Sequence, residues 1–365
     1  MNSTLRRTAM ATAALSLGLG TAGCGAFGSS APIYSGTSTS SLVVGLLLPD
    51  KSTARYEQFD KPLFESMVKE LDTNATVQYA NAGGSAETQS QQVGQMVDAG
   101  VKVLVIDAQD PAGIKPAIQA AHAKGVKIIA YDRLAQGPVD AYVSFDNEKV
   151  GELQGQGLLA ALHGNASSSS KIVEIDGAAS DPNAADFKKG FQSAVQGHLD
   201  IAYDASGDWK PDVAESKATD AINQIGASNI AGFYSANDGM AGGIITAMKH
   251  AGIGDRPIGG QDGQLDAVQR ILGGTQAYSI YKAYQPEAQA AATIAVHLMD
   301  GTSISMVATT TVTSGSGDSM PAQLLSPVLL VKANIEDTVV ADGLYTAAQI
   351  CTPNLTSACS AAGIH

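Results

Sequence analysis

The sequence contains few basic residues, few aromatic residues and no long apolar run near its start. Lys and Arg number 22 against 35 Asp and Glu, which gives a formal net charge of -13 at pH 7, and the basic residues form no cluster. Nucleic-acid-binding proteins present clustered basic side chains to the phosphates, so a nucleic-acid partner is not expected. The apolar run at residues 10–19 is too short to anchor the chain stably across a bilayer.

Apolar residues and glycine are abundant. Hydrophobic residues make up 44% of the 365 residues and charged residues only 16%, which is enough apolar material for two domains, each with its own core. Thirty-nine glycines, with aromatic residues at only 5%, suit an α/β protein with many tight turns between strands and helices.

The N-terminus has the pattern of an export signal. Arg6 and Arg7 precede the apolar run, and small residues lead up to Cys24. This arrangement resembles the lipobox of bacterial lipoproteins, which implies that residues 1–23 are removed and that Cys24 is acylated; an ordinary cleaved signal is the alternative. Residues 24–41 are rich in Ser, Thr, Gly and Pro and predict a flexible tether. We therefore expect an extracytoplasmic protein, lipid-anchored to the outer face of the cell membrane.

From residue 42 onward, apolar runs of strand length alternate with segments of helical spacing. This alternation predicts right-handed βαβ units and parallel sheets, and it restarts after Asn147, which predicts two lobes. The expected strands are 42–48, 76–79, 101–106, 126–130, 141–145, 172–175, 201–203, 230–234, 257–259 and 277–281. The expected helices are 59–71, 87–97, 111–124, 149–162, 183–195, 211–225, 239–250, 265–272 and 287–299.

Polar residues follow most of the expected strands. In an open parallel sheet the carboxyl ends of the strands face the crevice in which ligands bind. The alternative is that each Asp or Asn only caps the helix that follows it. The strand-end residues are Asp50, Arg55, Tyr56, Asp107, Asp110, Asp132, Arg133, Asn147, Asp181, Asn183, Trp209, Asn237, Asp238, Gln261, Asp262 and Lys282.

This set of side chains suits a sugar. Carboxylates and amides can accept hydrogen bonds from hydroxyls, Arg and Lys can donate to their oxygens, and aromatic rings can cover the C–H faces. No nucleophile–base arrangement is apparent. Trp209, the only Trp of the chain, is a candidate for such a ring, although it can also be read as core filling.

Five motifs point to one family. They are SFDNEKVGELQ (144–154), YDR (131–133), AND (236–238), GGQD (259–262) and IYK (280–282). Between about residues 43 and 343 the chain resembles the D-xylose-binding proteins of ABC importers, which are type I periplasmic sugar-binding proteins. The resemblance implies an α/β fold in which two Rossmann-like lobes, with parallel sheets flanked by helices, are joined by a three-segment hinge and close on one sugar.

The resemblance also implies roles for individual residues. Asn147 would lie at a hinge crossover. The N-terminal lobe would comprise residues 42–146 and 283–310, the C-terminal lobe 147–282 and 311–345, and the tail 346–365. The implied sugar contacts are Arg55, Tyr56, Asp132, Arg133, Asp181, Trp209, Asn237, Asp262 and Lys282.

The chain departs from the family pattern in two places. Xylose binders tend to carry Trp where Tyr56 stands, so D-xylose or a related aldose is expected but the sugar stays open. The tail is additional to the family core and contains Cys351 and Cys359, for which a disulfide is the simplest expectation in an oxidising exterior.

The expected function is that of a monomeric binding lipoprotein that delivers a monosaccharide to an ABC permease, without a cofactor or a metal. A sugar sensor for a membrane receptor is the main alternative. A glycoside hydrolase would also combine carboxylates with aromatic rings. A sugar-responsive repressor would need an N-terminal DNA-binding segment, and an export signal stands there instead.

Overall fold

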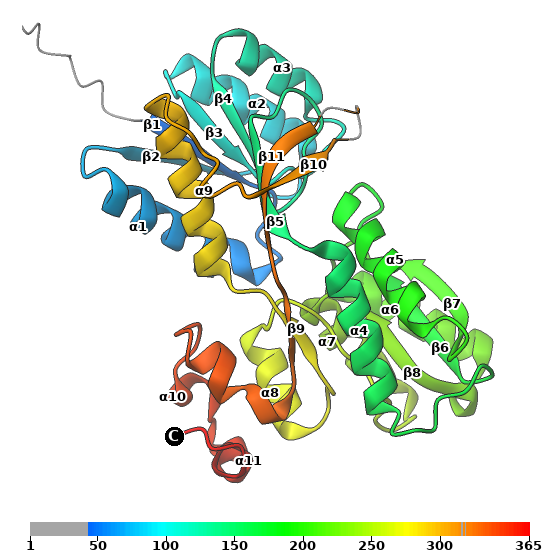
Figure 1. Cartoon of the computed structure of the whole chain (residues 1–365). Coiled ribbons are helices and arrows are strands. Elements are labelled where there is room, and N and C mark those ends of the chain that lie inside the picture. The colour runs from blue at the N-terminus through cyan, green and yellow to red at the C-terminus, as the bar shows by residue number, and fades with distance from the viewer. Residues whose placement is uncertain (1–42, 315–316, 318) are drawn as a thin grey trace, which may run out of the picture. The chain divides into compact units, whose positions relative to one another are not determined.

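The computed structural model describes residues 43–314, 317 and 319–365 (Figure 1). The expected signal at residues 1–23, the lipidation site Cys24 and the tether at 24–41 lie outside the described residues. Within the described part of the chain, no helix combines the length and the apolar character needed to cross a membrane.

The first lobe is built on a seven-stranded sheet with the strand order β10-β11-β5-β4-β3-β1-β2. Neighbouring strands are parallel except for the antiparallel pair β10 and β11. The carboxyl ends of β1 and β3 to β5 therefore meet at one edge of the sheet. The strands are β1 (Val43–Leu48), β2 (Thr76–Asn81), β3 (Val103–Ile106), β4 (Lys127–Tyr131), β5 (Ala141–Phe145), β10 (Thr310–Thr313) and β11 (Ser319–Leu325).

Helices cover both faces of this sheet (Figure 1). The alternation of side chains along β1 shows how the two cores arise. Leu46 packs in the core under α1 (Lys61–Leu71) and α9 (Tyr284–Met299), whereas Leu47 packs in the core under α2 (Ala86–Asp98) and α3 (Lys115–Ala123). A π-helical turn, η1 (Tyr56–Asp60), leads into α1.

The second lobe contains a smaller parallel sheet with the order β7-β6-β8. Isolated bridges from Phe233 to Ile258 and from Gly259 to Tyr278 continue it toward the antiparallel pair β9 and β12. The elements are β6 (Lys171–Asp176), β7 (Asp200–Ser206), β8 (Ile230–Ser235), β9 (Ser279–Tyr281), β12 (Val328–Leu330), α4 (Asn147–Ala161), α5 (Pro182–Val195), α6 (Pro211–Ile225), the 3-10 turn η2 (Ala227–Asn229), α7 (Asp238–Ala251) and α8 (Leu265–Gly273). The strand expected at 257–259 is thus reduced to bridge contacts, which is a correction.

The C-terminal segment 332–365, which includes the tail at 346–365, packs on α8 and forms a separate apolar cluster. Ile335, Val339, Ile350 and Ile364 are buried there, and a disulfide joins Cys351 to Cys359. The segment contains η3 (Lys332–Asn334) and η4 (Glu336–Val340), and the tail contains α10 (Ala347–Ile350), η5 (Pro353–Leu355) and α11 (Thr356–Ala361).

The chain passes between the lobes three times, from β5 to α4, from β9 to α9 and from β11 to β12. Asn147, expected at a crossover, is the first residue of α4, directly after the first passage. The expected boundary at residue 311 is wrong. Ala322 to Leu325 of β11 pair with Tyr142 to Phe145 of β5, so β10 and β11 belong to the first lobe. Pro321 lies inside β11, and proline weakens a strand signal in the sequence.

Candidate binding site

One cavity brings together all nine residues that were expected to contact a ligand. The first lobe contributes residues from the loop between β1 and η1, from the start of η1 and from the end of β4. The second lobe contributes residues from α5, from the loops after β6, β7 and β8 and from the 259–264 loop, and Lys282 lies at the passage from β9 to α9. The lining comprises Thr53, Arg55, Tyr56, Asp132, Arg133, Asp181, Asn183, Phe187, Trp209, Asn237, Gln261, Asp262 and Lys282.

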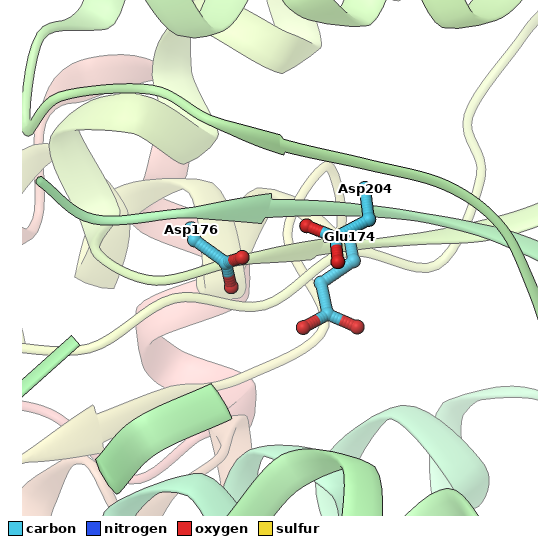
Figure 2. A group of neighbouring side chains, drawn as sticks. All are labelled: Glu174, Asp176 and Asp204. Carbon is cyan, nitrogen blue, oxygen red and sulfur yellow. The ribbon is translucent and has the colours of Figure 1, made fainter. Parts of the chain in front are cut away.

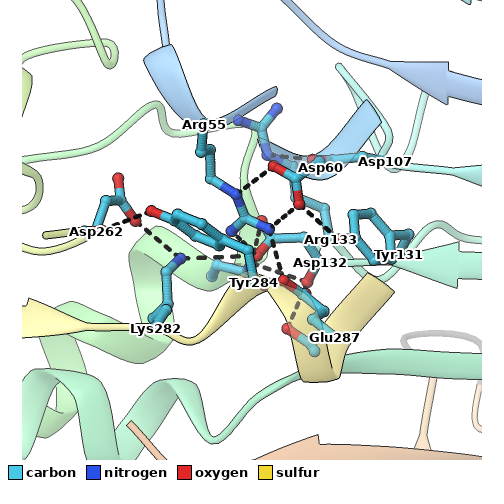
Figure 3. A network of polar contacts seen from close by, with 12 residues as sticks. Arg55, Asp60, Asp107, Tyr131, Asp132, Arg133, Asp262, Lys282, Tyr284 and Glu287 are labelled. Carbon is cyan, nitrogen blue, oxygen red and sulfur yellow. Dashed lines mark hydrogen bonds and ion pairs between the residues drawn. The ribbon is translucent and has the colours of Figure 1, made fainter. Parts of the chain in front are cut away.

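Arg55 is the most heavily engaged cation of the site. Its guanidinium is 2% exposed, and Nη1 donates to Oδ1 of Asp132 over 2.9 Å. Behind the cavity it also pairs with Asp60 and Glu287 (Figure 3). The pKa of Glu287 is raised to about 8 because burial disfavours its charge, although Arg55 opposes the shift.

Asp132 follows β4 with a backbone φ of 55°, in the left-handed region that residues other than glycine rarely adopt. Its carbonyl oxygen accepts hydrogen bonds from Tyr142 Oη, Ser144 Oγ and Asn183 Nδ2 at 2.9, 2.7 and 3.0 Å. These bonds hold the strained conformation in place. Burial alone would raise the pKa of the Asp132 carboxyl, but Lys282, Arg55 and Arg133 together lower it to about 2.

Arg133 connects the two lobes. Its Nε lies 2.8 Å from Oδ2 of Asp181 and 3.5 Å from Oδ1 of Asp107, and its Nη2 donates to Tyr56 Oη over 3.3 Å. Burial raises the pKa of Asp107 well above its usual range, and Arg133 only partly opposes this. Asp107 and Asp181 thus share one cation, Arg133.

Lys282 lies between two carboxylates, 3.1 Å from Asp262 Oδ1 and 3.7 Å from Asp132 Oδ1. Asp262 has a φ of 96°, and Tyr284 Oη donates to its carbonyl over 2.6 Å. Gln261 Oε1 is buried and has no hydrogen-bond partner among the described residues, whereas Asp262 Oδ1 has the ion pair with Lys282. A ligand hydroxyl is the kind of donor that would satisfy Gln261 Oε1.

Aromatic rings border the same cavity. Trp209, with a φ of 58°, donates from Nε1 to Asp181 Oδ2 over 3.2 Å and meets Phe187 edge to face at 6.3 Å between centroids. It is half-buried against the core of the second lobe and also lines the cavity, so packing against the core does not exclude a place beside a ligand. Tyr56 is 2% exposed.

Helix capping and cavity lining also prove compatible. Asp181 accepts from the backbone N–H of Asn183 and caps α5, and Asn237 accepts from the N–H of Met240 and caps α7. Both residues line the cavity at the same time. Asp and Asn at these strand ends thus hold the helix that follows and present polar atoms to the site.

Some strand-end residues lie elsewhere. Asp50 binds backbone N–H groups of the 52–53 turn, Asp110 those of Ala112 and Gly113, and Asp238 is buried against Gln276 and Ser279. Two lining residues, Thr53 and Phe187, were missed, since neither ends a strand or belongs to a motif. Asn183 and Gln261 stood among the strand-end residues but were not assigned to the ligand set.

The fold and this site define a binding protein of the periplasmic type. Residues 44–303 match the family model described as "Periplasmic binding protein domain", and the chain belongs to that family. The D-xylose-binding periplasmic protein of Escherichia coli (strain K12) is 33% identical over 320 residues, which span 84% of this chain and 92% of that protein. The multiple sugar-binding periplasmic receptor ChvE of Rhizobium radiobacter is 30% identical over 331 residues, with 84% and 92% covered.

Solved structures agree with this membership. An ABC transporter solute-binding protein from Clostridium phytofermentans with bound β-D-glucose superposes with a TM-score of 0.77 at 25% identity, over 84% of this chain and 99% of that one. A carbohydrate transporter solute-binding protein from Chloroflexus aurantiacus in complex with D-glucose gives 0.75 at 26%, over 85% and 98%. The α/β fold is therefore confirmed. The chain is a solute-binding protein, and the glycoside hydrolase alternative has no support.

Proposed function

We propose that the chain binds one monosaccharide, D-xylose, D-glucose or a related aldose, in the cavity between its lobes and delivers it to an ABC permease. The observation that carries the proposal is the convergence of the nine expected residues from both lobes on one cavity. Three cations, several carboxylates and two aromatic walls match the donors, acceptors and C–H faces of a sugar ring. The names of the xylose-binding and glucose-bound relatives support the same ligand class.

Closure of the lobes follows from the way the ligand set is divided. Arg55, Asp132 and Arg133 belong to the first lobe, whereas Asp181 and Trp209 belong to the second, so a sugar gains all its contacts only with the lobes together. That difference in affinity is what shifts a population toward the closed state. Asn147, at the start of α4, would act as a hinge residue in this movement.

The cellular setting extends the proposal. The export pattern at residues 1–23 and the acylation of Cys24 would hold the protein at the outer face of the cell membrane, where it works as a monomer. The parent protein is expected to carry a lipid on Cys24 that is detectable by mass spectrometry, and a Cys24→Ser variant is expected to lack it. A parent protein without the lipid would contradict the anchor.

The sugar is tested by thermal shift over about twenty monosaccharides, because a tight ligand raises the unfolding midpoint. Calorimetric titration then measures affinity in Asp262→Ala and Arg133→Ala. Loss of a buried charged partner costs about 1.5–3 kcal/mol, or roughly 10- to 150-fold in affinity. Unchanged affinity in both variants would refute the site, and the absence of any sugar response in the parent protein would refute the function.

A sugar sensor is the second candidate, because one relative is named a receptor. The closed form would then be recognised by a membrane receptor in place of a permease, or in addition to one. Growth on the identified sugar at low concentration distinguishes the two. A deletion strain that still imports the sugar but no longer responds to it would favour the sensor.

A further inference from the structure

The guanidinium of Arg55 is held mainly by two carboxylates that do not line the cavity. Asp60 accepts from both Nε (2.8 Å) and Nη2 (2.7 Å), and Glu287 accepts from Nη2 (2.6 Å). Both acids are 0% exposed. Figure 3 shows them on the side of Arg55 that faces away from Asp262 and Lys282.

A count of donors shows what remains for a ligand. Arginine has five N–H groups. Nε and both hydrogens of Nη2 are taken by Asp60 and Glu287, and one hydrogen of Nη1 is taken by Asp132. One N–H of Nη1 is left without a partner among the described residues, on a side chain that lines the cavity.

Other contacts fix the plane of the guanidinium. Its Cζ lies 4.5 Å from the ring centroid of Tyr284, at the start of α9, and Tyr131 Oη donates to Asp60 Oδ1 over 2.5 Å. Asp60 ends η1, Tyr131 ends β4 and Glu287 belongs to α9, so three separate elements determine where this one donor points.

We propose that Asp60 and Glu287 are positioning residues, which fix Arg55 so that a single Nη1–H is aimed at one hydroxyl oxygen of the bound sugar. The inference rests on the proposed function and deepens it. It assigns a role in selectivity to two residues outside the cavity. Glu287 accepts from Arg55 Nη2 through one carboxylate oxygen, and Gln keeps an acceptor oxygen at this position, so Glu287→Gln can preserve the contact that Glu287→Ala removes.

The test compares Glu287→Ala with Glu287→Gln by calorimetric titration at pH 7. The probes are D-xylose, D-glucose and monodeoxy derivatives of each, which remove one hydroxyl at a time. In the parent protein, removal of one particular hydroxyl from the sugar should lower the affinity at least about tenfold, as expected for a lost hydrogen bond to a charged group. This loss of affinity is called the deoxy penalty. In Glu287→Ala that penalty should shrink to less than about threefold, because Arg55 is no longer held. Glu287→Gln should keep the penalty.

Further variants separate positioning from a general loss of stability. Glu174→Ala removes an equally buried carboxylate that does not line the cavity, so it should leave the deoxy penalty unchanged. In an Arg55→Lys background, Glu287→Ala should have no further effect on the penalty, because coupled residues are not additive. Asp60→Asn serves if Glu287→Ala does not fold, because it removes one of the two oxygens that accept from Nε and Nη2 of Arg55, so the penalty should shrink there as well.

The outcomes are distinct. Failure of the parent protein to bind either sugar would refute the proposed function itself. Binding by the parent protein, together with an unchanged deoxy penalty in Glu287→Ala, would overturn the positioning role and leave the function intact. An equal loss of the penalty in Glu287→Gln and Glu287→Ala would overturn it too.

Discussion

The ring of Trp209 occupies the space that a Cβ atom on residue 177 would fill. Three ring atoms, Cζ2, Cη2 and Cε2, would lie far inside van der Waals contact of a Cβ built on Gly177. The glycine at the end of β6 therefore lets the only Trp of the chain reach both the cavity and Asp181.

Gly177→Ala is expected to displace Trp209 and to weaken sugar binding by about tenfold or more, since a buried hydrogen bond and an aromatic contact are lost together. Calorimetric titration measures the loss. Gly94→Ala is the matched control, because a Cβ there has nothing within 4 Å in an exposed position of α2. Parent-like affinity in Gly177→Ala would show that the ring does not contribute to binding.

Trp209 should also report binding directly. As the single Trp, it accounts for all tryptophan fluorescence of the protein, and it changes from half-exposed to covered if a sugar lies against it. We expect a saturable change in emission during a sugar titration, with the same Kd as calorimetry. In Trp209→Phe the signal should vanish while weaker binding persists. A sugar that binds by calorimetry without altering emission would place the ligand away from this ring.

The acidic group Glu174, Asp176 and Asp204 predicts a loss of stability with rising pH (Figure 2). Burial raises the pKa of Glu174 to about 8, with a further contribution from Asp176, while Lys188 bridges Asp176 and Asp204. In the unfolded chain a Glu has a pKa of about 4.3. The folded state therefore holds more protons between about pH 4.3 and 8, and its free energy of unfolding falls as pH rises through this window.

Glu174→Gln should reduce that fall, since Gln does not ionise. Urea unfolding at pH 5, 6.5 and 8 gives the free energies. Glu152→Gln, a change at a half-buried position of α4 away from the acidic group, should keep the parent pH dependence. The same slope in Glu174→Gln as in the parent would contradict the assignment.

The disulfide between Cys351 and Cys359 should stabilise the tail. Closing so short a loop lowers the conformational entropy of the unfolded chain, which raises the free energy of unfolding by about 2.5 kcal/mol at 25 °C. Reduction, or Cys351→Ser with Cys359→Ser, should lower the thermal midpoint by roughly 5 °C. Differential scanning calorimetry with and without reductant measures this. The double variant should not respond to reductant, whereas Cys24→Ser should respond as the parent does. An equal response in the double variant would assign the effect to something else.

Local sequence patterns predicted most of the helices and strands. Buried strands such as 141–145 and the helix 211–225 are bounded by residues whose preferences act within a few positions, and the structure has both at the expected ends. The strand-end polar residues were equally readable, because parallel strands bring their carboxyl ends to one edge. Arg133 and Asp181 follow strands of different sheets, and it was the resemblance to the sugar-binding family that predicted both in one site.

Contacts that depend on tertiary packing could not be read in this way. Glu287 lies in the first turn of α9, and nothing near it in the sequence indicates that it meets Arg55. Phe187 looks like any core residue of α5. The strand β11 contains Pro321, and it forms because it pairs with β5, a segment far away in the sequence. Asp132 and Asp262 adopt a left-handed backbone, and because neither is a glycine, the sequence does not indicate this conformation.

The three passages of the chain between the lobes have a mechanical consequence. Two bodies joined by one flexible link can swing and rotate in any direction, whereas three separate links oppose torsion and leave bending as the compliant motion. In the proposed closure, Arg133 would therefore be brought back to the same alignment with Asp181. The accuracy with which the two lobes meet around a sugar would then depend on the stiffness of three connectors as much as on the cavity walls. These connectors are residues 145–147, 281–284 and 325–328.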